Sequence, residues 1–385
     1  MSVTSSFDYV LVGGGLQTTL IALALRARRP ASTIAVVEKA ETLGGNHTWS
    51  FHAGDVSARA LGWMEPLVAH RWPAHDVAFP SFARTIAQAY ASIPSARVDG
   101  LVRAALASSP GSSVYTGSTA VAVEARSVTL ACGRRLDARL VVDARGPDSP
   151  VVEGGAGFQK FLGLELVVSS PLGLDRPCLM DATVPQSRGF RFVYTLPLAA
   201  DRILVEDTYF SDSPDLDREG MRARVMEYAR ARGWRDPRVV REETGVLPLP
   251  WRGAPPRPRR SPLQAGYAGG WFHPVTGYSL PVAVRLAEHL SDRPAEEAFG
   301  PDLDRLAREH RRQARFARLL NGLMFGAYPP EERWHVLERF YRLPDPTIAR
   351  FYALRLRAVD RLRILGGRPP RGLSLRLAWS RLALA

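Results

Sequence analysis

Two adjacent acids, Glu206 and Asp207, lie in an otherwise largely apolar segment that runs from Arg202 to Phe210. This composition predicts a β-strand, in which neighbouring side chains point to opposite faces of the sheet. Glu206 and Asp207 therefore cannot both face one cavity. A carboxyl among apolar residues either takes a charged partner or has its pKa raised, and a raised pKa would suit a general acid. Taken alone, the segment favours a paired structural acid at the edge of a sheet.

A histidine that could carry a proton, His273, lies in a segment rich in glycine and aromatic residues, 266–279. Imidazole changes its charge near neutral pH, so it can serve in acid and base catalysis. A histidine in a tight loop can also simply hydrogen-bond to backbone, and the sequence alone favours that interpretation. A helix is predicted from about Pro281 to Leu290, with proline in its first turn and Ser279 as its cap.

The elements that would position these side chains begin with a glycine-rich turn near the N-terminus. Residues 7–12 predict a strand, 13–15 are three glycines in a tight turn, 16–28 predict a helix, and 33–37 predict a second strand that ends at Glu38. This is the order of a dinucleotide-binding unit. Glycines let the backbone approach a pyrophosphate, the helix N-terminus offers free N–H groups, and the acid accepts hydrogen bonds from ribose hydroxyls.

One residue departs from the dinucleotide-binding pattern. Thr18 stands where a third glycine normally allows the helix and the strand to pack closely. Threonine is small enough for the prediction to be kept. The expected dinucleotide contacts in this unit are therefore Gly13, Gly15, Leu16 and Glu38.

Later segments favour a flavin over a nicotinamide cofactor. Two glycines follow the acid at 44–45, and a strand ending in a small turn, 140–147, contains Asp143. The second segment resembles the internal loop that contacts the flavin in flavoproteins with two dinucleotide-binding domains. In such proteins the chain returns to the first domain in a segment like 266–279, and a helix N-terminus points at the flavin. FAD is therefore the expected cofactor, with Asp143, Gly277 and Tyr278 as further contacts.

The segments between these flavin-binding pieces read as an antiparallel sheet. Strand-like runs occur at 161–168, 178–184, 190–196 and 202–210, separated by proline and glycine turns. The expected fold class is α/β, a Rossmann-like FAD-binding domain with an inserted antiparallel-sheet substrate domain and a helical C-terminal region. The predicted boundaries are 1–155 for the FAD-binding domain, 156–255 for the substrate domain, 256–300 for the return to the FAD-binding domain, and 301–385 for the helical region.

Composition bounds the class of protein. The chain has 385 residues, of which 46% are hydrophobic and 23% charged, so disordered and fibrous classes are excluded. Cys132 and Cys178 lie far apart without metal-ligand spacing, so we expect no disulfide framework and no metal site, which fits a reducing cytoplasm. The sequence contains no run of about 18 apolar residues, so we expect no membrane-spanning helix.

The positive charge is concentrated at the C-terminal end. Residues 1–300 carry 33 basic and 30 acidic side chains, whereas 301–385 carry 18 and 8. Nearly all of the basic residues are arginines, so the high pI is weak evidence for nucleic acid and no nucleic-acid partner is expected.

A basic amphipathic helix is predicted over 348–365. Its apolar stripe comprises Ile348, Tyr352, Leu356, Val359 and Leu362, and its basic side comprises Arg350, Arg357 and Arg361. Such a helix could lie on an anionic membrane or could be a solvated helix packed on the domain, and base rates favour the second.

Taken together, these features resemble the bacterial lycopene β-cyclases over nearly the whole chain. The matching segments lie at 12–16, 44–52, 84–87, 142–147, 158–163, 180–186, 190–194, 205–209, 272–281 and 337–344. Those around His47 and Trp49 and around Met180 and Asp181 are not general features of flavoproteins.

The resemblance implies an isomerase, an intramolecular lyase that closes the ψ-ends of lycopene into β-rings, giving γ-carotene and then β-carotene. Reduced FAD would be required without being consumed, with NAD(P)H as the electron source. The family's key acid falls on Glu206, with Asp207 as its neighbour on the other face. Whether Glu206 gives the proton, or stabilises the cation while reduced flavin gives it, stays open.

The same resemblance changes the interpretation of the C-terminal region, because a long hydrocarbon must be taken from a bilayer. We therefore expect a cytoplasmic protein bound peripherally to the inner membrane, with its C-terminal helices near the point where linear carotenoids enter. Other enzymes of the carotenoid pathway are possible partners.

Two alternatives come from other functional classes. One is an FAD-dependent oxidoreductase, either a monooxygenase or a reductase of isoprenoid double bonds, acting on a hydrophobic substrate. It predicts NAD(P)H oxidation in proportion to product. The other is an inactive flavin- or carotenoid-binding protein, for which Glu206→Gln would change nothing.

Overall fold

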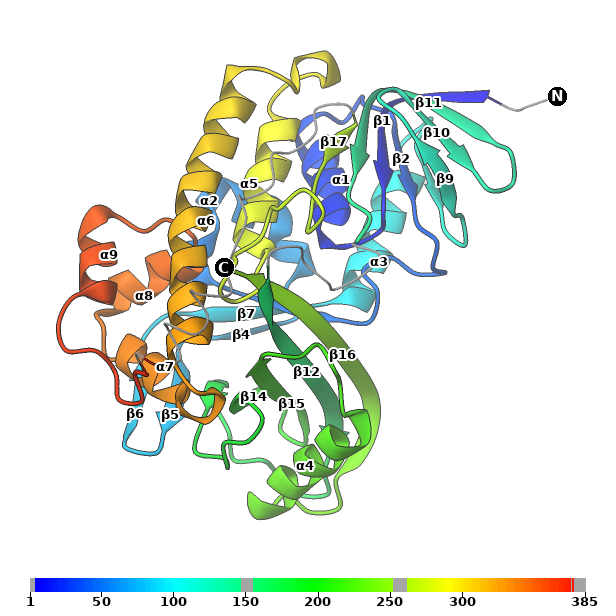
Figure 1. Ribbon diagram of the computed structural model, residues 1–385. Helices are drawn as coiled ribbons and strands as arrows, with labels where there is room; N and C mark the ends of the chain where they lie inside the picture. Colours follow the sequence, from blue (N-terminus) through cyan, green and yellow to red (C-terminus); the bar gives the residue numbers. More distant parts are fainter. Residues whose placement is uncertain (1–3, 147–154, 252–261, 375, 377–385) are drawn as a thin grey trace.

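A computed structural model describes residues 4–146, 155–251, 262–374 and 376 (Figure 1). The N-terminal sequence forms a sheet with the strand order β8-β2-β1-β11-β10-β9, and β17 pairs with β11. Its strands are β1 (Thr4–Val12), β2 (Ile34–Val37), β8 (Ser113–Tyr115), β9 (Ala120–Val123), β10 (Ser127–Leu130), β11 (Arg135–Asp143) and β17 (Leu263–Gln264). The central strands β2, β1 and β11 are parallel, and their paired central segments are buried, as expected of strands covered on both faces.

Helices from distant parts of the sequence cover the first sheet. α1 (Leu16–Arg28) packs against α5 (Leu280–Ser291) and α3 (Ser95–Ala107). The amide of Gln17 donates to the carbonyl of Ala283 at 3.1 Å, which ties the first turn of α1 to α5. The predicted strand, turn, helix and strand at the N-terminus are confirmed. β17, which follows the second sheet in the sequence, pairs with β11 of the first sheet.

The second sheet has the order β16-β12-β15-β14-β13-β5-β6. Its strands are β5 (His75–Phe79), β6 (Phe82–Ile86), β12 (Ala156–Val167), β13 (Cys178–Asp181), β14 (Phe190–Ala199), β15 (Arg202–Ser211) and β16 (Arg238–Pro250). Only the β13–β5 pair is parallel among these described pairings. The antiparallel runs predicted within 158–210 are confirmed as β12 to β15, whereas β5 and β6 come from the part of the sequence assigned to the FAD-binding domain.

One face of the second sheet is covered by α4 (Arg218–Ala231), which the sequence analysis did not predict (Figure 1). Val225 of α4 packs with Leu164 and Val205 in an apolar cluster between helix and sheet. A small third sheet, with the order β3-β7-β4, lies between the two larger ones; its strands are β3 (Thr48–His52), β4 (His70–Trp72) and β7 (Tyr90–Pro94). The opposite face of the second sheet packs partly against the third sheet, where Trp72 and Tyr90 cluster with Leu196 and Leu204, and it also lines a cavity.

The remaining helices lie mainly at the C-terminal end, where the long α6 contacts β16 of the second sheet (Figure 1). They are α2 (Ala58–Met64), α6 (Pro301–Ala327), α7 (Trp334–Tyr341), α8 (Asp345–Tyr352) and α9 (Ala358–Leu365), with short 3-10 turns η1 (Ala53–Asp55), η2 (Glu65–Leu67), η3 (Ala295–Glu297) and η4 (Pro330–Glu332). Within the described ranges, no helix combines the length and the apolar composition needed to cross a bilayer.

The single amphipathic helix predicted over 348–365 is wrong. The chain breaks between α8 and α9, where Leu354 adopts a left-handed backbone conformation with φ of 52°. Asp360, fully buried in α9, accepts hydrogen bonds from Arg350 at 2.6 and 2.7 Å and from the hydroxyl of Thr347 at 2.9 Å. This pairing folds α9 back on α8, so the predicted stripe is divided: Ile348 is buried, whereas Leu362 is 72% exposed.

We predict that Asp360→Asn destabilises the protein by about 3 kcal/mol, because it removes one partner of a buried ion pair. The Arg350 guanidinium holds the pKa of Asp360 below its usual range. A depressed carboxyl pKa stabilises the fold above the pKa of the unfolded chain, about 4, and this contribution is lost as the pH falls below that value. Urea denaturation from pH 7 to pH 3 measures both effects. The exposed Asp201→Asn is the matched control, and equal stability of the two variants at pH 7 would contradict the prediction.

Candidate active site

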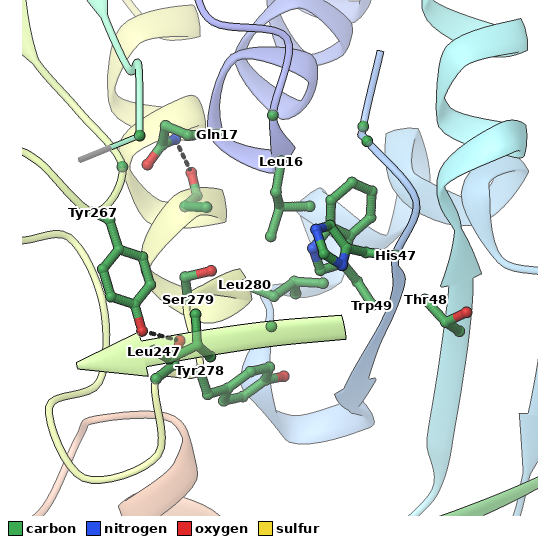
Figure 2. Close-up of a pocket in the computed structure, with 18 of the residues that line it drawn as sticks. Leu16, Gln17, His47, Thr48, Trp49, Leu247, Tyr267, Tyr278, Ser279 and Leu280 are labelled. Atoms are coloured by element: carbon green, nitrogen blue, oxygen red, sulfur yellow. Dashed lines mark hydrogen bonds between the residues drawn. The ribbon is translucent and has the colours of Figure 1, made fainter. Parts of the chain in front are cut away.

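A cavity of about 1150 Å³ lies between the first sheet, the second sheet and the C-terminal helices. Figure 2 shows one part of it, where Leu16 at the start of α1 and Leu280 at the start of α5 approach the same space. His47 and Trp49, which flank the start of β3, lie on the opposite side of this part. Two helix N-termini therefore meet at one end of the cavity, which is an arrangement that favours an anionic ligand.

The glycine turn forms a cradle at this end. Gly13 has a φ of 92°, and a Cβ there would lie 2.8 Å from the carbonyl oxygen of Ala144, so a larger residue would be strained and obstructed. Gly15 lines the cavity, and a Cβ at this position would have no other heavy atom within 4 Å. The backbone N–H of Gly14 donates to the Glu38 carboxylate at 2.5 Å. Gly13, Gly15, Leu16 and Glu38 all line the cavity, as the dinucleotide-binding prediction requires.

Thr18, which replaces the third glycine, is fully buried and satisfies its hydroxyl locally. It donates to the carbonyl oxygens of Gly13 and Gly15. The threonine therefore makes its hydrogen bonds within the turn, and the glycine cradle keeps its shape.

The second glycine segment supplies the other side of this end of the cavity. Gly277 has a φ of 65°, and a Cβ there would lie 2.7 Å from both Leu247 and the hydroxyl of Tyr267. Gly277 and Tyr278 line the cavity, as expected. Ser279 occupies the N-cap position of α5, but its side chain makes no capping hydrogen bond, so the predicted cap is wrong in that detail.

Asp143 does not itself line the cavity. Its carboxylate holds the side chain of Arg145 through contacts of 2.8 and 2.9 Å, and the neighbouring residues 144–146 line the cavity instead. Asp143 therefore shapes the turn at the end of β11. Pro147, the last residue of the predicted turn, lies outside the described residues.

Glu206 faces the cavity from the second sheet. It lies directly opposite Gly163 of β12 on one side and Tyr194 of β14 on the other, so the three residues share one face. The hydroxyl of Thr208 donates to the carboxyl of Glu206 at 2.9 Å. Burial, reinforced by the charge of Glu243, raises the pKa of Glu206 to about 8. Glu206 is therefore protonated at neutral pH and can act as an acid.

Asp207 points to the other face and does not line the cavity. It is fully buried between Arg191 of β14 and Arg224 of α4, whose Nε atoms donate to it at 2.6 and 3.0 Å. The predicted division of the two acids between the two faces is confirmed. With no contact to the cavity, Asp207 holds α4 on the sheet, and we do not assign it to the reaction.

His273 is also outside the cavity. It is buried, its Nε2 donates to the carbonyl oxygen of Phe351 at 2.9 Å, and its Nδ1 accepts from the N–H of Val275 at 3.2 Å. Burial lowers its pKa to about 3. Both ring nitrogens are committed to backbone, so His273 joins the loop before α5 to α8, and we do not assign it to proton transfer.

Several cavity residues were not predicted from the sequence. Glu243 of β16 is a buried second carboxyl of the cavity, and His52, Tyr90, Tyr194, Tyr341 and Tyr352 form its aromatic end together with the predicted Tyr278. The ring centroids of His52 and Tyr90 are 4.8 Å apart, and the Tyr194 hydroxyl donates to Ser50 at 3.1 Å. The run Arg241 to Glu243 is the signal that could have found Glu243, because it places charges within a segment that otherwise alternates as a strand.

The two neighbouring acids give a matched prediction for stability. Glu206→Gln should stabilise the protein by about 1 to 3 kcal/mol at pH 7, since a carboxyl whose folded pKa is raised lowers stability as the pH rises from about 4 towards 8. Asp207→Asn should destabilise it by about 3 kcal/mol, because Arg191 is left buried without its partner. Urea denaturation of the cofactor-free proteins measures both. Effects of the same sign would contradict the assigned faces.

Comparisons with known proteins agree with this arrangement. The profile of the family described as "Lycopene cyclase protein" matches residues 8–378. A lycopene beta-cyclase from Pseudescherichia vulneris is 44% identical over 375 residues, covering 94% of each chain. Another from Pantoea ananas is 42% identical over 368 residues, covering 94% of this chain and 95% of its own.

Solved structures with low sequence identity share the fold. A geranylgeranyl bacteriochlorophyll reductase-like protein from Thermoplasma acidophilum has a TM-score of 0.63 at 13% identity, covering 100% of both chains. PqsL, a probable FAD-dependent monooxygenase from Pseudomonas aeruginosa, has 0.59 at 17%, covering 86% of this chain and 98% of its own. The halogenase PltM, solved in complex with FAD, has 0.64 at 10%, covering 90% and 81%.

These neighbours confirm the expected fold class, an α/β flavoprotein architecture with an added antiparallel sheet and C-terminal helices. The sequence matches extend over nearly the whole chain, and at this level of identity they show family membership as well as a shared fold. The chain belongs to the lycopene cyclase family.

Proposed function

We propose that the protein is a lycopene β-cyclase, an isomerase that closes the ψ-ends of lycopene into β-rings and gives γ-carotene and then β-carotene. The observation that carries this proposal is the position of Glu206. A carboxyl with a raised pKa faces a cavity that also contains a dinucleotide cradle, in a chain 44% identical to a bacterial lycopene beta-cyclase. Cyclisation needs one proton delivered to a hydrocarbon away from water.

The chemistry of the cavity suits a cationic intermediate. Glu206 would give its proton to the terminal double bond, and the neighbouring alkene would then attack the resulting cation to close a six-membered ring. Loss of a ring proton completes the isomerisation, so the composition of the carotenoid is unchanged. The faces of Tyr90, Tyr194 and His52 stabilise positive charge, and burial keeps His52 neutral by lowering its pKa.

The cradle fits FAD. Gly13 and Gly15 admit a pyrophosphate at the N-terminus of α1, Glu38 lies where ribose hydroxyls are bound, and the N-terminus of α5 points into the same space. Gly277 and Tyr278 would lie along the flavin. When bound and reduced, with NAD(P)H as the source of electrons, FAD would supply negative charge next to the reacting end.

Removal of the acid tests the mechanism. Glu206→Gln should lower the cyclisation rate by about 10²- to 10⁴-fold, the usual contribution of a general acid, whereas Glu206→Asp should retain part of it. Because the acid works only when protonated, the wild-type rate should fall as the pH rises above about 8. The measurement is β-carotene formed from lycopene with FAD and NADPH over pH 6 to 10. A Glu206→Gln variant as active as wild type would contradict the assignment.

The product distinguishes cyclisation from oxidation or reduction on the same fold. In a host that accumulates lycopene, the protein should yield a pigment of unchanged mass with a shifted absorption spectrum. In vitro, NADPH oxidation should be far below the amount of β-carotene formed. A pigment altered in mass by oxygen or hydrogen would indicate an oxidoreductase, and lycopene left intact would contradict the proposal.

The surface of the C-terminal helices supports peripheral attachment to the cytoplasmic side of the inner membrane. Exposed residues of α6 form one stripe at three- and four-residue spacing: Arg308, Arg312, Arg315, Leu319 and Leu323. α9 packs beside it, since the side chain of Arg361 donates to Gln313 at 3.3 Å, and it exposes Val359, Leu362 and Leu365. The apolar residues would enter the interface while the arginines contact anionic headgroups. Tyr341 of α7 and Tyr352 of α8 line the cavity, so this region also borders the substrate.

Flotation with vesicles tests this attachment. The wild-type protein should float with vesicles that contain phosphatidylglycerol at low salt, and less so in 0.5 M salt, where charges are screened over roughly 4 Å. The double substitution Leu323→Glu and Leu362→Glu should lower the bound fraction by roughly tenfold or more. Val121→Glu, an exposed apolar residue of β9, is the matched control. Wild-type protein that stays wholly in the aqueous fraction would contradict the attachment.

A further inference from the structure

Glu243, the second carboxyl of the cavity, stands in one cross-strand row with Glu206. Gly163 of β12 lies directly opposite Glu206 on β15 and directly opposite Glu243 on β16, so both acids project from the same face of the sheet. A Cβ at position 163 would lie 3.0 Å from Cγ of Glu243. The glycine therefore leaves room for the side chain of Glu243, which lies over it, and both carboxyls line the cavity.

Arg241 fixes the charge and the position of Glu243. Its guanidinium donates to Glu243 at 2.5 Å, to Glu165 at 2.7 Å and to the hydroxyl of Thr48 at 2.7 Å. Glu243 is 3% exposed, and its carboxyl has this cation as a direct partner, whereas Glu206 accepts a hydrogen bond only from the hydroxyl of Thr208 among the described residues. The carboxyl that stays ionised in such a pair is the one next to the cation.

The charge of Glu243 raises the pKa of Glu206, so ionisation of one carboxyl disfavours ionisation of the other. The causes of the two pKa shifts favour Glu243 as the ionised member. Burial raises the pKa of Glu243, but Arg241 counteracts it, whereas burial and the charge of Glu243 both raise the pKa of Glu206. The cavity thus contains a proton donor and a proton acceptor on one sheet face, on two strands that are separated by β12.

We propose that Glu243 is the base of the cyclisation, a role that rests on the proposed function of the protein. Glu206 gives a proton to the terminal carbon–carbon double bond, ring closure transfers the positive charge to a ring carbon, and the Glu243 carboxylate removes a proton from the neighbouring ring carbon. The electron pair of that C–H bond becomes the ring double bond. One proton enters and one leaves, no electron is transferred, and return of the proton from Glu243 to Glu206 restores the pair.

The position of the base decides the kind of ring. The cationic ring carbon has three neighbours that carry hydrogen: the carbon attached to the polyene chain, a ring methylene and a methyl group. Loss of a proton from the first gives the β-ring, from the second an ε-ring, and from the third a ring with an exocyclic methylene. A fixed carboxylate beside one of these hydrogens selects a single product, so Glu243 is a determinant of ring type as well as of rate.

The test compares ring types formed from lycopene by purified, FAD-loaded wild-type protein and its Glu243→Gln variant, with products separated by chromatography and identified by NMR. The variant should cyclise roughly 10²-fold or more slowly, the scale of a lost general base, and its products should include ε-rings or exocyclic methylene rings. Glu165→Gln is the control. Glu165 is another carboxylate partner of Arg241 but does not line the cavity, so this variant should form the same ring type as the wild-type protein.

Glu243→Gln products that contain only β-rings would overturn the assignment, whatever their rate of formation. If that variant forms too little product to analyse, Glu243→Asp decides: recovered β-cyclisation supports the base, and a folded, flavin-loaded Glu243→Asp protein that is equally inactive contradicts it. Circular dichroism and bound flavin establish that the variants are folded. Wild-type protein that leaves lycopene intact contradicts the proposed function, whereas wild-type activity with unchanged ring types contradicts only the role of Glu243.

Discussion

Strand β15 sends one of two adjacent carboxyls to each face of the second sheet, and the two faces serve different purposes. Asp207 is neutralised by Arg191 and Arg224, which fastens α4 to the sheet and closes that face. Glu206 has no such cation and faces the cavity, where burial keeps it protonated. The same alternation of side chains therefore provides both an anchor and an acid. A shift of one residue in the pairing of β15 would exchange the two carboxyls and abolish both roles.

The parts of the site that are local in sequence are those that could be predicted. The glycine turn, α1 and Glu38 lie within one short unit, and the period of two in β15 determines that Glu206 and Asp207 diverge. Whether Glu206 or Asp207 points into the cavity depends on Arg224 in α4, a helix that was not predicted from the sequence. The spacing of residues alone therefore could not decide which acid lines the cavity. For His273 the sequence favoured a contact with backbone, and the structure shows one. Asp143, expected at the flavin, instead holds Arg145 in the turn after β11.

The placement of Glu243 in one row with Glu206 could not be predicted for a different reason. The partner of Glu243 in the row is Gly163, on a strand 80 residues earlier in the chain, and the register that aligns them is set by the long β12–β16 pairing. The C-terminal prediction failed for a similar reason. Asp360 reaches back to Arg350 and folds the chain, whereas periodicity alone treats 348–365 as one rod.

The contact between Gln17 and Ala283 has a consequence for biosynthesis. The cradle begins with the first helix of the chain but gains its second helix N-terminus only when α5 has been made, 266 residues later. During translation the apolar surface of α1 that packs on α5 stays exposed until α5 has been made, and contacts of such long range slow folding. A ligand that bridges α1 and α5 binds only the completed fold and stabilises it by mass action. The supply of flavin in the cell should therefore govern how much of the newly made chain survives, apart from any part the cofactor has in the reaction.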